Sequence, residues 1–194
     1  MKGRIRSIKG VDVGMTVPNT QNNHSAVGRF VESELKKYGH NYNDGKGIDL
    51  PTLRTENKTR KRKSKSAHTV GRMTTNDIVN TDWDNSSVKE KISAYQNTYE
   101  WDDTFCEITE NSVYDFTDPD IQEKLKQGYE LGRAEIVSGA CGNNTKTYNG
   151  VIWQKDPGKE QWQYRITEKG MREIKSMARQ KSFRKLFEVK KQDD

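Results

Sequence analysis

Two carboxylates and a lysine lie close together in one short stretch, as Asp49, Glu56 and Lys58. If Glu56 and Lys58 are on one strand, their side chains share a face, because side chains alternate along a strand. An aspartate just before that strand brings a second carboxylate beside Glu56. Two carboxylates with open water positions suit Mg²⁺, and a lysine beside the metal can orient or deprotonate an attacking water. The spacing predicts a site for phosphodiester cleavage, although Glu-x-Lys is also common on ordinary charged surfaces.

Three segments of the chain resemble one nuclease family in their order and spacing. They are Gly28-Arg-Phe-Val-Glu32, Asp49-Leu-Pro-Thr-Leu-Arg-Thr-Glu56-Asn-Lys58-Thr59 and Trp83-Asp-Asn-Ser86-Ser-Val88-Lys-Glu-Lys91-Ile92. They resemble the family of the mismatch-repair nicking endonuclease MutH and its relatives among restriction enzymes that cut at GATC. A looser likeness continues through Leu131-Gly-Arg-Ala-Glu135-Ile, so the resemblance spans residues 28–155.

The resemblance implies an α/β protein of the PD-(D/E)XK restriction-endonuclease-like fold. We expect a central mixed β-sheet flanked by helices, with a DNA cleft between two lobes. The implied activity is sequence-specific hydrolysis of double-stranded DNA to 5′-phosphate and 3′-hydroxyl ends. The implied cofactor is Mg²⁺, for which Mn²⁺ can substitute.

Carried over residue by residue, the resemblance implies that Asp49 and Glu56 ligate the metal together with the backbone carbonyl of Asn57. Lys58 would act on the water nucleophile. Glu32 would hold a second metal ion or a water molecule on it, and its alternative is an ordinary surface acid on a helix. A fifth catalytic residue is implied in the third segment: Lys91 would approach the scissile phosphate or the attacking water, and its alternative is a solvated helix residue.

The chain departs from the family directly after the motif. Asn57 stands where the family has an apolar residue, and the apolar strand that follows is replaced by Thr59-Arg-Lys-Arg-Lys-Ser-Lys. A basic run of this kind favours phosphate contacts. The residues assigned to it are Arg60, Lys61, Arg62 and Lys63. A targeting stretch or a mobile loop remains the alternative.

Base recognition is predicted in the Gly- and Asn-rich turn at 139–150, because the family reads its site from the corresponding region. Asn143 and Asn144 can pair with adenine, and Lys146 can donate to guanine O6 and N7. Tyr148 completes the predicted DNA-binding set. A plain Asn/Gly hairpin is the alternative.

The composition of the 194 residues predicts one modest core. Hydrophobic residues make up 30%, and the net charge is +6 from 34 Lys and Arg against 28 Asp and Glu. The basic residues lie on either side of an acidic stretch at 92–123, which favours a polyanionic partner. No window resembles a membrane span, the start lacks the apolar stretch of a signal peptide, and the two cysteines are expected to be free thiols. We expect a cytoplasmic protein, bacterial or phage-encoded.

Helical and extended patterns interleave along the chain, which predicts a mixed α/β domain over residues 1–194. The expected parts are an irregular lead-in at 1–23, a catalytic core at 24–155 and a basic C-terminal region at 156–194. Helices are predicted at 25–38, from Ser86 or Ser87 to 95, at 118–131 and at 168–187. Extended pieces are predicted at 48–59, 68–77, 132–138, 151–154 and 164–166.

Several functions stay open from the sequence. A restriction enzyme would act as a homodimer on a palindromic site, whereas a repair nickase would depend on a MutL-like ATPase. A non-catalytic DNA-binding protein is an alternative of another class. RNA binding is less favoured, because aromatic stacking platforms beside the basic runs are sparse.

Overall fold

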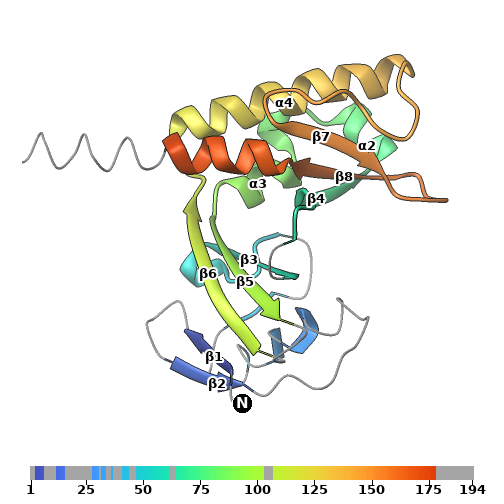
Figure 1. Cartoon of the computed structure of the whole chain (residues 1–194). Coiled ribbons are helices and arrows are strands. Elements are labelled where there is room, and N and C mark those ends of the chain that lie inside the picture. Colours follow the sequence, from blue (N-terminus) through green and yellow to red (C-terminus); the bar gives the residue numbers. More distant parts are fainter. Residues whose placement is uncertain are drawn as a thin grey trace, which may run out of the picture. The chain divides into compact units, whose positions relative to one another are not determined.

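A computed structural model describes residues 3–6, 12–15, 28–30, 32–33, 36, 41–43, 47–61, 64–102 and 107–177. The chain, predicted as one nuclease domain, divides into two compact units. Unit 1 comprises residues 1–65 and 94–114, and unit 2 comprises residues 66–93 and 115–194 (Figure 1). Each unit is described by itself.

Unit 1 contains two small sheets. Strands β1 (Gly3–Arg6) and β2 (Asp12–Met15) pair antiparallel. In the second sheet, β3 (Thr55–Lys61) runs parallel to β5 (Tyr95–Asp102), and β6 (Glu107–Asp115) lies on the other side of β5. A 3-10 helix, η1 (Pro51–Leu53), leads into β3.

Unit 2 contains a three-stranded antiparallel sheet and several helices. The strands β4 (His68–Thr74), β7 (Val151–Lys155) and β8 (Gln161–Ile166) are ordered β4-β8-β7. The helices are α2 (Thr75–Asn80), η2 (Trp83–Asn85), α3 (Ser87–Ile92), α4 (Pro119–Ser138) and a helix over 168–177. Alternate residues of β8 are buried, so one face of the sheet meets the core.

Local capping signals set where the helices of unit 2 begin and end. The Asp118 carboxylate accepts hydrogen bonds from the backbone N–H groups of Asp120 and Ile121, and Pro119 occupies the first turn of α4. Ser86 caps α3 by accepting from the N–H of Lys89. Gly139 closes α4 with a φ of 68°, a left-handed conformation that glycine adopts without strain.

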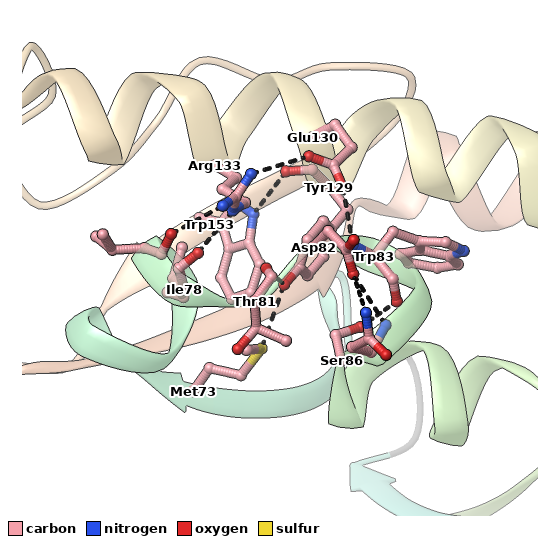
Figure 2. Close-up of polar contacts among 12 residues, drawn as sticks. Met73, Ile78, Thr81, Asp82, Trp83, Ser86, Tyr129, Glu130, Arg133 and Trp153 are labelled. Carbon is pink, nitrogen blue, oxygen red and sulfur yellow. Dashed lines mark hydrogen bonds and ion pairs between the residues drawn. The ribbon is translucent and has the colours of Figure 1, made fainter.

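Four aromatic rings form the centre of the unit 2 core. Trp83, Tyr129, Trp153 and Tyr164 are all buried, and the ring centroids of Tyr129 and Trp153 are 5.3 Å apart in an edge-to-face arrangement. The Tyr129 hydroxyl donates to the backbone carbonyl of Thr81 at 2.9 Å (Figure 2). Burial, as the largest cause, raises the pKa of this hydroxyl to about 12.

Polar residues of α4 tie this core to the preceding helices. Arg133 donates to the backbone carbonyls of Ile78 and Val79 at the end of α2, at 2.7 and 2.8 Å. Glu130 accepts a hydrogen bond from the backbone N–H of Trp83 at 2.8 Å. Figure 2 shows these contacts converging beside Tyr129. The Arg133 hydrogen bonds satisfy carbonyl groups that a short helix leaves open at its C-terminus, and the Glu130 carboxylate satisfies a backbone N–H at the start of η2.

The mixed α/β class is confirmed, but several elements differ from the sequence-based predictions. The strand predicted at 132–138 is wrong, because α4 continues to Ser138. Gly128, Gly132 and Ile136 are buried at helical spacing on the face that meets β7, so packing extends the helix. The described strands fall in three sheets instead of one central sheet.

Regular elements also occur in the predicted lead-in and C-terminal region. The lead-in at 1–23, predicted as irregular, contains β1 and β2. The region from 156 onward contributes β8 and the helix at 168–177 to unit 2, and its Ile174 is buried. The hydrophobic core of unit 2 therefore includes residues beyond 155. Among the described residues, no helix is long and apolar enough to cross a membrane.

Candidate active site

A tight reversal of the chain brings Asp49 and Glu56 to the same place. Leu50 and Thr55 exchange backbone hydrogen bonds of 2.9 and 3.1 Å, with η1 between them. Arg54 closes this turn in the left-handed conformation, with a φ of 48°. Asp49 and Glu56 directly flank the paired residues, so the local fold sets their proximity.

The two carboxylates are joined through backbone N–H groups. The N–H of Asn57 donates to Oδ2 of Asp49 at 2.8 Å. The N–H of Asp49 donates to Oε2 of Glu56 at 3.3 Å. The Asn57 N–H thus helps to orient the Asp49 carboxylate, and the Asp49 N–H helps to orient the Glu56 carboxylate.

Lys58 lies on the same face of β3 as Glu56, as strand alternation predicts. Its Nζ is 2.5 Å from Oε1 of Glu56, whose side chain is only 1% exposed, whereas the Lys58 side chain is 24% exposed. Burying a carboxylate is costly unless its charge is compensated. A buried acid paired with a partly accessible lysine is an arrangement more typical of a functional site than of a stabilising surface pair.

Tyr42 is a site residue that the sequence reasoning missed. Its neighbour Asn43 donates its backbone N–H to the carbonyl of Asp49 at 2.8 Å, which holds the 41–43 segment beside the turn. Burial first, then the negative charges of Asp49, Glu32 and Glu56, raise the pKa of the Tyr42 hydroxyl. A tyrosine in an Asn- and Gly-rich loop has no periodic spacing that could have indicated this role.

Glu32 belongs to a helical segment of unit 1, in which residues 28–30, 32–33 and 36 are described. Its side chain is half-buried, and its charge acts on the Tyr42 hydroxyl. Glu32, Asp49 and Glu56 therefore all act on a single phenol. The three carboxylates predicted from the sequence are thus close enough to Tyr42 to interact with it electrostatically.

The donor set suits a hard cation. Carboxylate oxygens from Asp49 and Glu56 are the ligands that Mg²⁺ prefers. Among the residues that the structure describes, no group of three or more Asp, Glu, His or Cys side chains is close enough together to hold a metal ion. Two carboxylates match the way in which Mg²⁺ is bound, because this ion keeps several water molecules.

Lys91, the fifth predicted catalytic residue, belongs to unit 2. It lies on α3, and its Cδ is 3.7 Å from the position that a Cβ at Gly71 would occupy. The structure thus groups Glu32, Asp49, Glu56 and Lys58 in unit 1 and assigns Lys91 to the other unit.

Other residues of the family-like segments have structural roles. Trp83 is in the aromatic core, Ser86 caps α3, and Val88 is fully buried. A Cβ at Gly132 would lie 2.4 Å from Cδ1 of Trp153, so only glycine permits this approach of α4 to β7. These packing and capping contacts explain why these residue types occur at these positions without assigning them a catalytic role.

The turn at 139–150 is anchored to α4 through Glu135. The Glu135 carboxylate accepts from the Lys146 backbone N–H at 3.2 and 3.3 Å and from the Tyr148 hydroxyl at 2.8 Å. The hydrogen bond from the Tyr148 hydroxyl to Glu135 is the largest cause of the raised pKa of Tyr148. The side chains of Asn143, Asn144 and Lys146 are exposed, whereas Tyr148 is half-buried.

The predicted phosphate-binding run is described only in part. Arg60 lies on β3 and donates to the backbone carbonyl of Ser64. Lys61 is the last residue of β3. Arg62 and Lys63 lie outside the described residues.

Comparison with protein-family models, with curated proteins and with solved structures finds no match to this chain.

Proposed function

We propose that this protein is a Mg²⁺-dependent DNA endonuclease of the restriction type, with the PD-(D/E)XK architecture that its sequence resembles. The observation that carries the proposal is the arrangement of Asp49, Glu56 and Lys58. Two carboxylates linked through backbone N–H groups lie with a lysine ammonium 2.5 Å from the buried one. Metal-dependent phosphodiester hydrolysis can use such groups together.

In this proposal Asp49, Glu56 and the Asn57 carbonyl would hold the metal, and Glu32 would support a second ion. When bound, Mg²⁺ supplies Lewis acidity toward the phosphate and lowers the pKa of water. Lys58, whose ammonium group is held at Glu56, would orient the attacking water, and its positive charge would favour loss of a proton from that water. Its positive charge also stabilises the negative charge that develops on the phosphate.

The proposed reaction balances as a simple hydrolysis. The water oxygen bonds to phosphorus while the bond between phosphorus and the 3′ oxygen breaks. The leaving 3′ oxygen takes a proton and becomes a hydroxyl, and the new phosphorus–oxygen bond leaves the phosphate on the 5′ end.

We expect cleavage of supercoiled plasmid DNA to require a divalent cation. Mg²⁺ or Mn²⁺ should support cutting, whereas Ca²⁺ should permit binding without efficient turnover, because its coordination is looser. Gel electrophoresis of a plasmid incubated with each ion provides the measurement. Efficient cleavage in excess EDTA would contradict the metal assignment.

The same gel separates the biological alternatives. Linear product without a partner protein favours a restriction enzyme, which cuts both strands as a homodimer on a palindrome. Open circles that depend on a MutL-like ATPase favour a repair nickase. DNA binding without any cleavage across these ions favours a non-catalytic DNA-binding protein.

We also expect the turn at 139–150 to contribute to base recognition. Asn143, Asn144 and Lys146 have exposed side chains on a turn that Glu135 holds in place. Single alanine substitutions at these residues should relax site preference by about 1–3 kcal/mol for each lost base contact. Cleavage of a library of site variants measures the change.

Binding to non-specific DNA at low salt provides the control for these variants. It should remain close to that of the unmodified protein, because phosphate contacts carry no sequence information. Unchanged site preference and cleavage rates in all three variants would show that the turn is structural only.

A further inference from the structure

The three-stranded sheet of unit 2 has an outer face, opposite the face that meets the core. In this sheet β8 lies between β4 and β7 (Figure 1), and residues paired across antiparallel strands share a face. The core face carries Trp153 and Tyr164, which pair with each other and are fully buried. The outer face carries two rows of side chains, which are Thr69, Arg165 and Ile152 in one row and Arg72, Gln163 and Gln154 in the next. Apart from Ile152, this outer face is therefore polar.

Arg165 lies on the central strand of the outer face and is oriented by two hydrogen bonds. Its Nη1 donates to Oε1 of Gln154 on the neighbouring strand, and its Nη2 donates to the backbone carbonyl of Ala67 at 3.0 Å. Its Nε is buried and has no hydrogen-bond acceptor among the described residues. A buried donor without an acceptor is destabilising, so a bound group that supplies acceptor oxygens here would be favoured.

Arg72 adds a second guanidinium group to the outer face. Its side chain is 53% exposed, and its Nε lies 3.5 Å from Oδ2 of Asp156. The other oxygen of Asp156 accepts a hydrogen bond from Nε2 of Gln163. Burial, as the largest cause, and then the positive charge of Arg72 lower the pKa of the Arg165 guanidinium, whereas Asp156 acts in the opposite direction. Two positive groups therefore meet one carboxylate, which leaves an excess of positive charge that suits an anion.

We propose that the outer face of the unit 2 sheet binds the phosphate backbone of duplex DNA through Arg72 and Arg165. The planar guanidinium group matches the geometry of phosphate oxygens, and Gln and Thr side chains such as those beside it are also common phosphate contacts. The inference rests on the proposed function, since it takes DNA as the partner. It adds a contact surface beyond the basic run at 60–63 and would position DNA without reading its sequence.

The test measures the affinity of the full chain for duplex DNA by fluorescence anisotropy over a series of salt concentrations. EDTA is present throughout, so that metal binding does not contribute. Each phosphate contact adds about 0.9 to the slope of log affinity against log salt, so Arg72→Gln should lower the magnitude of this slope by about 1. Duplexes of unrelated sequence should show the same loss. Arg165→Gln should act in the same direction, whereas Arg72→Lys keeps the charge and should retain most of the slope.

Lys89→Gln is the matched control, because it also removes a positive charge that pairs with a carboxylate, that of Asp84. Lys89 lies on α3, whose Val88 is 3.6 Å from the Cβ position of Gly71, a residue paired with the buried Tyr164 on the core face. The slope for Lys89→Gln should equal that of the unmodified protein. An equal loss in this control would overturn the proposal, because any lost charge would then have the same effect. Thermal melting verifies that each variant is folded, and Arg72→Gln, at a largely exposed side chain, decides the test if Arg165→Gln fails to fold.

The outcomes separate this inference from the proposed function. If the unmodified protein binds no duplex DNA at low salt, the proposed function fails and this inference fails with it. If the protein binds DNA but Arg72→Gln keeps the normal affinity and slope, the outer face is not a DNA contact, and the proposed function stands. A lower slope in both Gln variants of the arginines, with Arg72→Lys and Lys89→Gln close to normal, supports the proposal.

Discussion

Replacing Lys58 by alanine should lower the rate of DNA cleavage by about 10²–10⁴-fold, the range found for general acid–base groups. DNA binding should change little, because one charge is lost from a chain with 34 basic residues. The effect is large because the ammonium group lies 2.5 Å from Glu56, within the group of residues assigned to the reaction. Single-turnover cleavage in Mg²⁺ and fluorescence anisotropy in Ca²⁺ measure the two properties separately.

Lys89→Ala is the matched control for this substitution. Lys89 also pairs with a carboxylate, that of Asp84 at 2.6 Å, but the pair is solvent-accessible and lies in unit 2. The Lys89→Ala variant should cleave DNA at the same rate as the unmodified protein. Loss of binding and cleavage together in a folded Lys58→Ala protein would contradict the assignment of Lys58 to the chemistry.

A second variant keeps the Lys58 prediction testable if the first one fails to fold. Lys58→Ala leaves the buried Glu56 carboxylate without its ammonium partner, which can be strongly destabilising. Combining Glu56→Gln with Lys58→Met removes both charges and retains similar volume. This double variant should be folded and still inactive, and normal cleavage by it would overturn the proposed site.

Replacing Trp153 by alanine should lower the free energy of unfolding of unit 2 by about 3–5 kcal/mol. Trp153 is fully buried, and its ring centroid is 5.3 Å from that of Tyr129 and 5.1 Å from that of Tyr164. The substitution leaves a cavity at the centre of the aromatic core. Urea denaturation followed by circular dichroism measures the loss, and Leu131→Ala on the exposed side of α4 should change stability by less than about 0.5 kcal/mol.

The close approach of Gly132 to Trp153 predicts that the effect of Gly132→Ala on stability changes sign when Trp153 is removed. Gly132→Ala places a Cβ about where Trp153 already lies, so overpacking should destabilise the normal protein by roughly 1–3 kcal/mol. With Trp153→Ala the space is open, and the same change should stabilise α4 by up to about 1 kcal/mol through helix propensity. Gly142→Ala, where a Cβ would meet nothing within 4 Å, is the control. Equal effects in both backgrounds would show that the two residues do not interact.

The sequence alone determined those features that depend on neighbouring residues. Asp118 with Pro119 predicts the start of α4, and the structure confirms this cap. The start of α3 was predicted at Ser86 or Ser87, and Ser86 is the cap in the structure. The alternation of Glu56 and Lys58 predicts a shared face of one strand, as observed. Each of these signals acts over a few residues, so no distant contact is needed to read it.

The tertiary structure decided the features that depend on distant partners. Strands β5 and β6 were not predicted, and they are ordered by pairing within the β3-β5-β6 sheet. The stretch at 132–138 is helical because Gly132 and Ile136 pack on the face of α4 that meets unit 2's core. Tyr42 joined the candidate site because a backbone hydrogen bond from Asn43 to the Asp49 carbonyl holds the 41–43 segment there. In each case the deciding interaction lies between residues whose proximity local spacing does not encode, which is why tertiary packing overrides local propensity there.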